Sequence, residues 1–189
     1  MVARVSANAN TNTNAGSPLW NPSRDLLENS QLAGFMRRRV DATGDKGLIE
    51  YKNLWQWSVD RPDQFWSALW DYAAVIGDKG SVALENGDKM PGARFFPQSR
   101  INYAENLLRR RDSHAAIIFR DETGAERQLT FAQLYDEVSR WQQAFKDIGV
   151  KEGDRVAGYM PNMPETIVAM LAAARLGAIW SSASPHFGV

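Results

Sequence analysis

The side chains best placed for chemistry belong to Ser184, Pro185 and His186, which follow the apolar segment "AIWSSA" late in the sequence. The imidazole of histidine titrates near neutral pH, so it can exchange a proton or pair with an anion. In open parallel sheets, ligands bind beyond the carboxyl ends of the strands. If the apolar segment is such a strand, these residues form a candidate ligand loop. The competing interpretation of His186 is an ordinary loop residue.

The motifs of several common site chemistries are missing. The sequence has no cysteine, which excludes disulfides, thiolate metal sites and a cysteine nucleophile. His114 and His186 lack the spacing of a metal-binding motif. There is no glycine-rich phosphate loop followed by a lysine, no dinucleotide-binding glycine pattern and no G-x-S-x-G elbow. We therefore predict no metal site and no catalytic residue within these 189 residues.

The carboxylates have structural interpretations. Asp136 and Glu137 fall on the polar side of a predicted helix, and Asp121 and Glu122 belong to a predicted turn. A solvated surface is the favoured interpretation of all four. Asp154 directly precedes a predicted strand, where an aspartate side chain commonly bonds its own turn backbone.

The overall charge excludes one class of partner. With 22 basic and 22 acidic residues the net charge is zero, so we predict no nucleic-acid partner. The short basic run Arg109–Arg111 is expected to close a helix, because cations are favoured at helix C-termini. No apolar run reaches the roughly 18 residues of a membrane span, and the start lacks the apolar middle of a secretory signal. We expect a soluble, cytoplasmic protein.

The second part of the chain predicts an α/β arrangement. Residues 114–130 predict a β-hairpin, and Thr130 is a suitable N-cap for the amphipathic helix that follows. Further on, a strand at 155–160, a helix between Pro164 and Gly177 and a strand at 178–184 predict a parallel βαβ unit. The candidate loop at Ser184–His186 therefore lies at the carboxyl end of a predicted parallel strand.

The first part of the chain predicts a helical module. Residues 1–17 form a polar tail that we expect to be disordered, and residues 18–113 contain five of the seven tryptophans. Ser23 or Ser30 can cap a first helix, and Arg61-Pro62 is expected to separate two further helices. The last of these helices carries an apolar face that we expect to be core: Phe65, Trp66, Leu69 and Trp70. A further helix is expected from about Ser99, with Tyr103, Leu107 and Leu108 at helical spacing.

Three segments carry a resemblance to a known family. "GDRVAGYMPNMPETIVAMLAAARLGAIWSS" resembles the opening of the AMP-binding domain in the adenylate-forming acyl-CoA synthetase superfamily. "MPGARFFPQSRINYAENLL" is similar to the N-terminal segment of its acetyl-CoA and acetoacetyl-CoA synthetase branch. "GAIWSSASPHFGV" resembles the acetoacetyl-CoA synthetase pattern, with His186 where that pattern has an aspartate. The resemblance runs from about Pro18 to Val189.

The resemblance implies the fold class and the reaction. The fold is α/β, with a helical module over 18–113 and, over 114–189, a β-hairpin and the first βαβ unit of an incomplete AMP-binding domain. The family joins acetoacetate to coenzyme A with ATP and Mg²⁺, through an acyl-adenylate. Its phosphate loop and catalytic lysine lie downstream of the position matching Val189. The resemblance also implies that the loop at Ser184, Pro185 and His186 faces the substrate or coenzyme A.

Several interpretations stay open at this point. We expect the 189 residues alone to be inactive and to bind none of ATP, Mg²⁺ and coenzyme A tightly. An alternative is a stand-alone binding module that pairs with a complementary chain or with itself, because a truncated parallel sheet exposes an unpaired edge. A third possibility is part of another short-chain acyl-CoA synthetase.

Overall fold

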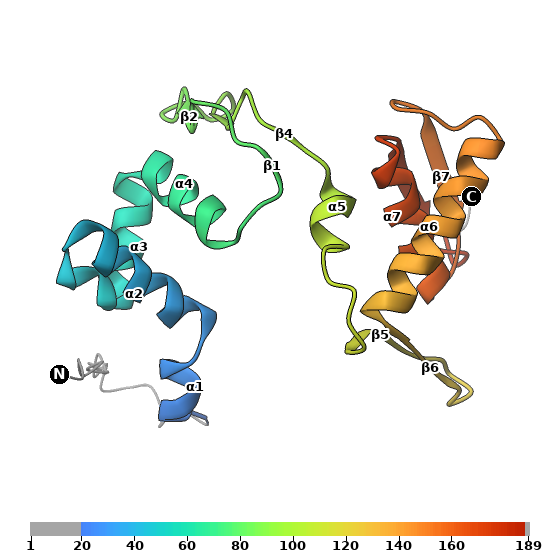
Figure 1. Cartoon of the computed structure of the whole chain (residues 1–189), viewed down its shortest axis with the longest axis horizontal. Helices are drawn as coiled ribbons and strands as arrows, with labels where there is room; N and C mark the ends of the chain where they lie inside the picture. The colour runs from blue at the N-terminus through green and yellow to red at the C-terminus, as the bar shows by residue number, and fades with distance from the viewer. Residues whose placement is uncertain (1–19, 188–189) are drawn as a thin grey trace. The chain divides into compact units, whose positions relative to one another are not determined.

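The computed structural model describes residues 20–187, so the tail predicted to be disordered lies outside the described residues. The chain divides into two compact units (Figure 1). Within the described residues, the first unit comprises 20–75 and 79–99, and the second comprises 76–78 and 100–187. No helix in this described part is long and apolar enough to cross a membrane.

The first unit is helical, as its sequence predicts. It contains α1 (Arg24–Glu28), α2 (Gln31–Thr43), the 3-10 helix η1 (Lys46–Ile49), α3 (Tyr51–Asp60) and α4 (Pro62–Tyr72). Ser23 and Ser30 each accept a backbone N–H as N-caps of α1 and α2. Gly44 ends α2 in the left-handed region at φ 74°, which glycine adopts without steric cost. Of the two alternative caps, Ser30 begins the predicted helix α2, while Ser23 caps a separate short helix, and the break at Arg61-Pro62 is confirmed.

The core of the first unit is aromatic. The Phe35 ring packs edge-to-face on Phe65 and Tyr72, with ring centroids 5.9 and 5.2 Å away. Phe65 and Leu69 face this core, as predicted for α4. The two tryptophans of that helix make other contacts: Trp66 packs on Phe95 and Trp70 packs on Phe96. These two phenylalanines lie in and just after β3 (Arg94–Phe95), which pairs antiparallel with β2 (Leu84–Glu85).

The second unit begins with a short antiparallel pair and a short helix. β1 (Gly77–Asp78) pairs with β4 (Arg100–Ile101), and α5 (Tyr103–Leu107) follows. The predicted helix therefore exists, although it starts later than expected. Ala104 within the helix and Leu108 directly after it are buried, whereas Tyr103 and Leu107 are 60% and 46% exposed.

Asn102 explains this orientation of α5. Its side chain accepts the N–H of Glu105 as an N-cap and donates to the carbonyl of Ala174 at 3.0 Å. This bond fastens the start of α5 to the C-terminal end of the later helix α7 (Pro164–Arg175). α5 therefore belongs to the second compact unit, which resumes at Arg100, and the domain boundary expected at residue 113 stays a prediction.

The β-hairpin and the long helix follow the sequence prediction. β5 (Ala115–Arg120) pairs antiparallel with β6 (Glu126–Thr130). α6 (Phe131–Asp147) starts at a complete capping box, in which Thr130 and Gln133 each satisfy the other's backbone N–H.

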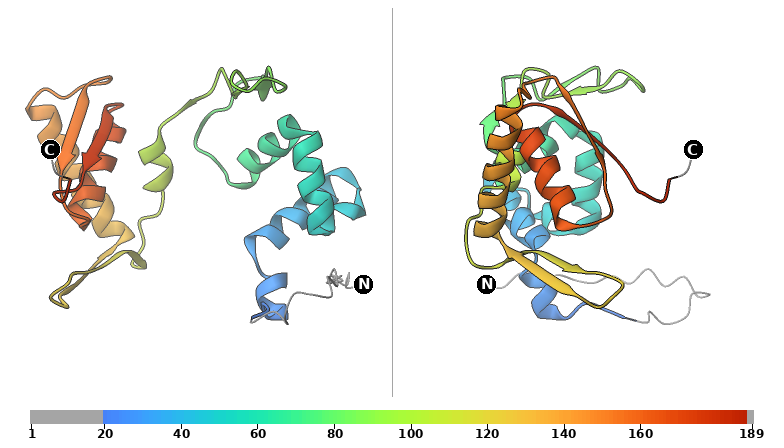
Figure 2. Two further views of the ribbon diagram at one scale, coloured as in Figure 1. Left: turned by 180° about the vertical axis from the view of Figure 1, so that it is seen from behind. Right: turned by 90° about the vertical axis from the view of Figure 1, so that its right-hand side faces the viewer.

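The predicted βαβ unit is also present. β7 (Arg155–Tyr159) and β8 (Ile179–Ala183) pair in parallel, from Arg155 opposite Ile179 to Tyr159 opposite Ala183. α7 connects the two strands and packs against both (Figure 2). The α/β architecture expected from the sequence is confirmed.

One contact inside this unit tolerates no side chain. A Cβ at Gly158 would lie 2.6 Å from the ring of Trp180 on the neighbouring strand, closer than carbon atoms approach. Position 158 therefore favours glycine, because the indole of Trp180 occupies the space that a side chain would need.

We predict that Gly158→Ala destabilises the chain by about 1 to 3 kcal/mol, the usual cost of overpacking a core. Urea denaturation followed by tryptophan fluorescence measures this loss. The matched control is Ala157→Val, which adds volume on the exposed side of the same strand and should change stability little. Equal effects of the two substitutions would show that Trp180 does not confine position 158.

Candidate ligand edge at strands β7 and β8

Two loops lie at the carboxyl ends of the parallel strands. One spans residues 160–163 after β7, and the other is the turn at 184–187 after β8. Because the strands run parallel and in register, both loops leave the same edge of the sheet. This is the edge at which open parallel sheets bind ligands. We call the pair of loops the ligand edge.

The structure brings the three predicted site residues together in the second loop. The N–H of Phe187 donates to the carbonyl of Ser184 at 3.0 Å, and the N–H of His186 to the Ser184 hydroxyl at 3.3 Å. The hydroxyl of Tyr159, the last residue of β7, donates to the carbonyl of Pro185 at 2.9 Å. Pro185 and His186 are exposed, so the imidazole is available to a ligand.

The first loop is closed by the start of α7. Pro164 occupies the first turn of the helix, and the hydroxyl of Thr166 donates to the carbonyl of Pro161 at 2.8 Å. The N–H of Thr166 donates to the carbonyl of Met163 at 3.0 Å. The loop is therefore held by the helix that follows it and, at its first residue, by the bond from the N–H of Met160 to the carbonyl of Ala183.

An ion pair joins the hairpin to the same helix end. Arg127 on β6 donates from both terminal nitrogens to the two carboxylate oxygens of Glu165, at 2.6 and 2.7 Å. This bidentate pair holds the pKa of Glu165 below its ordinary value, chiefly through the hydrogen bond from Arg127. Glu165 lies in the first turn of α7, where the helix dipole also favours a negative charge.

A polar cluster secures the opposite end of α7. Arg175 donates to the hydroxyl of Tyr135 at 2.9 Å and to that of Ser139 at 3.1 Å, both on α6. The guanidinium of Arg111 stacks on the Tyr135 ring, 3.8 Å from its centroid. The hydrogen bond from Arg175 lowers the pKa of Tyr135 below its ordinary value. Arg111, Tyr135 and Arg175 border a small cavity of about 210 Å³.

The basic run 109–111 has a different role from the one expected. α5 ends at Leu107 with no basic residue in its last turn, so favourable helix-end electrostatics does not explain the run. Instead, Arg110 pairs with Asp112 at 2.9 Å and stacks on Phe131, 4.1 Å from the ring centroid. The run thus fastens the loop after α5 to the face of α6.

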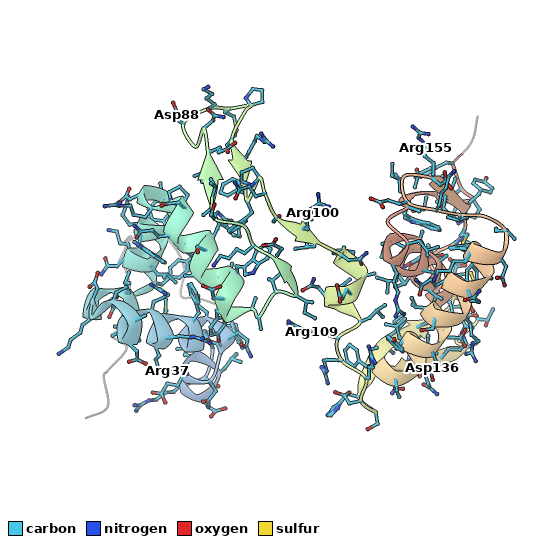
Figure 3. The ribbon with its side chains drawn as sticks, turned by 45° about the horizontal axis from the view of Figure 1, so that its top comes forward. Arg37, Asp88, Arg100, Arg109, Asp136 and Arg155 are labelled. Carbon is cyan, nitrogen blue, oxygen red and sulfur yellow. The ribbon has the colours of Figure 1, made fainter. Side chains whose placement is uncertain are left out.

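The predicted structural roles of the carboxylates agree with the geometry. The Asp154 carboxylate accepts the N–H of Lys151 at 2.9 Å, and the Asp121 carboxylate accepts three groups of its own turn. Asp136, labelled in Figure 3, is exposed on α6. Within residues 20–187, no group of three or more histidine, cysteine, aspartate or glutamate side chains could hold a metal ion.

The sequence alone does not identify three residues that contact the ligand edge: Arg127, Tyr159 and Glu165. Arg127 and Glu165 are 38 positions apart, so no local spacing connects them. Tyr159 has no sequence feature that distinguishes it from the other residues of the predicted strand at 155–160. A parallel strand pairing in register would have placed its side chain beside the second loop, which is the one signal that could have pointed to it.

Two family models match the chain. The model described as AMP-binding enzyme matches residues 104–189, and the model described as acetyl-coenzyme A synthetase N-terminus matches residues 51–107. The two matches meet at α5, close to the boundary between the compact units.

Acetoacetyl-CoA synthetases of several organisms match most of the chain. It is 48% identical over 177 residues to acetoacetyl-coenzyme A synthetase of Rhizobium meliloti (strain 1021), covering 92% of this chain and 27% of that protein. Acetoacetyl-CoA synthetase of Xenopus tropicalis is 39% identical over 90% of this chain and 26% of its own. The solved acetoacetyl-CoA synthetase from Streptomyces lividans superposes with a TM-score of 0.80 at 35% identity, covering 91% of this chain and 27% of that structure. This chain therefore spans about a quarter of these relatives' length.

We predict that Glu165→Gln lowers stability at neutral pH and has a smaller effect in acid. Because the folded-state pKa of Glu165 is depressed, its contribution is complete above the ordinary glutamate value of about 4.3 and is lost as the pH falls through the folded-state pKa. The difference between the urea midpoints of the two proteins should be largest at about pH 7 and smaller at about pH 3.

The control for this prediction is Glu122→Gln, in the exposed hairpin turn. Its urea midpoint should match that of the unsubstituted chain at both pH values. A Glu165→Gln difference that is the same at both pH values would contradict the ion-pair explanation.

Proposed function

Because the chain belongs to the acyl-CoA synthetases of the AMP-binding enzyme family, we propose that it supplies the N-terminal portion of an ATP-dependent acetoacetate–CoA ligase. The observation that carries this proposal is the shared backbone of both units with the Streptomyces lividans acetoacetyl-CoA synthetase. In this proposal, residues 18–113 are the synthetase N-terminal module and residues 114–189 begin the AMP-binding domain. The compartment we propose is the cytoplasm.

The reaction proposed for the whole enzyme has two steps. Acetoacetate attacks the α-phosphorus of ATP, giving acetoacetyl-adenylate and releasing pyrophosphate. The thiol of coenzyme A then attacks the acyl carbon, giving acetoacetyl-CoA and releasing AMP. Negative charge builds on the phosphates in the first step, and Mg²⁺ together with cationic side chains would stabilise it.

This chain supplies part of that machinery. No glycine-rich phosphate loop with a lysine occurs in its sequence, so the phosphate chemistry is assigned to the remainder of the whole enzyme. Its own contribution is the ligand edge, where we propose that Ser184, Pro185 and His186 face the acyl substrate or coenzyme A. The exposed imidazole of His186 can donate a hydrogen bond to either ligand. Alone, the 189 residues are predicted to be inactive.

A second proposal concerns the sheet that carries the ligand edge. Within the described residues β7 and β8 form a two-stranded sheet, and the side chains of Tyr159 and Ile179 are exposed on it. Unpaired strand edges are templates for pairing with another chain. We propose that the 189-residue chain self-associates through this sheet when no further strand covers it. Light scattering that shows a monomer at high concentration would contradict this.

The proposed ligase function predicts that a chimera of this chain with the rest of a related enzyme is active. This chain, joined at Val189 to the part of the Rhizobium meliloti relative that follows the matching position, should form AMP only when acetoacetate, ATP and coenzyme A are all present. The expected rate is lower than that relative's own rate by roughly ten- to hundredfold, because a misplacement of about 1 Å in an active site can already cost about a hundredfold.

Two controls frame this measurement. The remaining part of the relative without any N-terminal portion should be inactive, and so should this chain by itself. A chimera that is monodisperse and shows a cooperative thermal transition, yet forms no AMP, would overturn the proposal. AMP formation by this chain alone would contradict the assignment of the phosphate chemistry to the remainder.

A further inference from the structure

We propose that Tyr159 is a positioning residue whose hydroxyl fixes the turn at 184–187 and so aims His186 at the ligand. The inference rests on the proposed function for the identity of that ligand, but not for the geometry. It is carried by the 2.9 Å hydrogen bond from the Tyr159 hydroxyl to the carbonyl of Pro185.

The ladder of the sheet ends before this turn. Tyr159 is opposite Ala183, and the last backbone bond between the two segments runs from the N–H of Met160 to the carbonyl of Ala183 at 3.1 Å. Beyond Ala183, the backbone of the turn makes no further ladder bond among the described residues. Its orientation relative to the sheet therefore has to come from another contact.

The remaining bonds of the turn are internal. Both the N–H of His186 and the N–H of Phe187 donate to Ser184, through its hydroxyl and its carbonyl. These bonds define the shape of the turn, but they leave it free to rotate as a body about the end of β8. In the described part of the chain, the Tyr159 hydroxyl makes the hydrogen bond that ties the turn back to β7.

The exposure of Tyr159 assigns this role to the hydroxyl rather than to the ring. The residue is 66% exposed, so its ring contributes little to the core and its loss should leave global stability nearly unchanged. Phenylalanine at this position keeps the ring and removes the tie. The local geometry of the turn can thus be changed without unfolding the strand that presents it.

The first arm of the test uses the 189-residue chain itself. In Tyr159→Phe, the ¹⁵N order parameters of the His186 and Phe187 amides should fall from rigid values of about 0.85 towards about 0.6. Those of the β7 and β8 amides should not change. Tyr103→Phe is the matched control, because Tyr103 is also exposed and its hydroxyl makes no hydrogen bond within the described residues. Unchanged order parameters in the turn of Tyr159→Phe would overturn the inference.

The second arm uses the active chimera. Losing one hydrogen bond of about 1 kcal/mol predicts a roughly three- to tenfold rise in KM for coenzyme A or acetoacetate. The KM for ATP and the melting temperature should stay unchanged, whereas a merely structural role would impair all three ligands together. An equal change in every KM, or in none, would overturn the positioning role. An inactive unsubstituted chimera would instead count against the proposed function and leave the first arm decisive.

Discussion

The packing of α7 against α6 is the constraint on which the second unit depends. Among the described residues, Leu171 of α7 and Val138 of α6 are the largest fully buried side chains, and Ala104 and Leu108 belong to the same cluster. α7 is also the connection between β7 and β8. A helix held in one place by a close-packed core therefore fixes where both strands end, and with them the loops of the ligand edge.

Polar contacts at the two ends of α7 fix its orientation more specifically than apolar packing can, because hydrogen bonds and ion pairs depend on direction. At its start, Glu165 forms a bidentate ion pair with Arg127, and at its end Arg175 donates a hydrogen bond to the hydroxyl of Tyr135. The acid and the base each lie at the helix end that the dipole favours. Since these groups are partly solvated, their energetic contributions are modest, and their main effect is to fix the rotation and register of the helix.

The sequence predicts the parts of this structure that depend on local signals. Ser30 and Thr130 predict the starts of α2 and α6, because their side-chain oxygens can cap a helix. Pro164 and Gly177 predict the start and the end of α7. The orientation of α5 and the contact of Tyr159 with Pro185 could not be predicted, because they depend on which segments meet after folding. The reaction likewise came from family resemblance, since the loop at Ser184–His186 contains no motif that specifies a reaction.

Amide hydrogen exchange of the 189-residue chain tests most directly whether the core of the second unit holds the ligand edge in place. If it does, the amides of β7 and β8 should open together with those of α6 and α7, with one common free energy. The short helix α1, which contains no buried residue, should exchange much faster. Strands that exchange as fast as α1 while α6 and α7 stay protected would contradict the account.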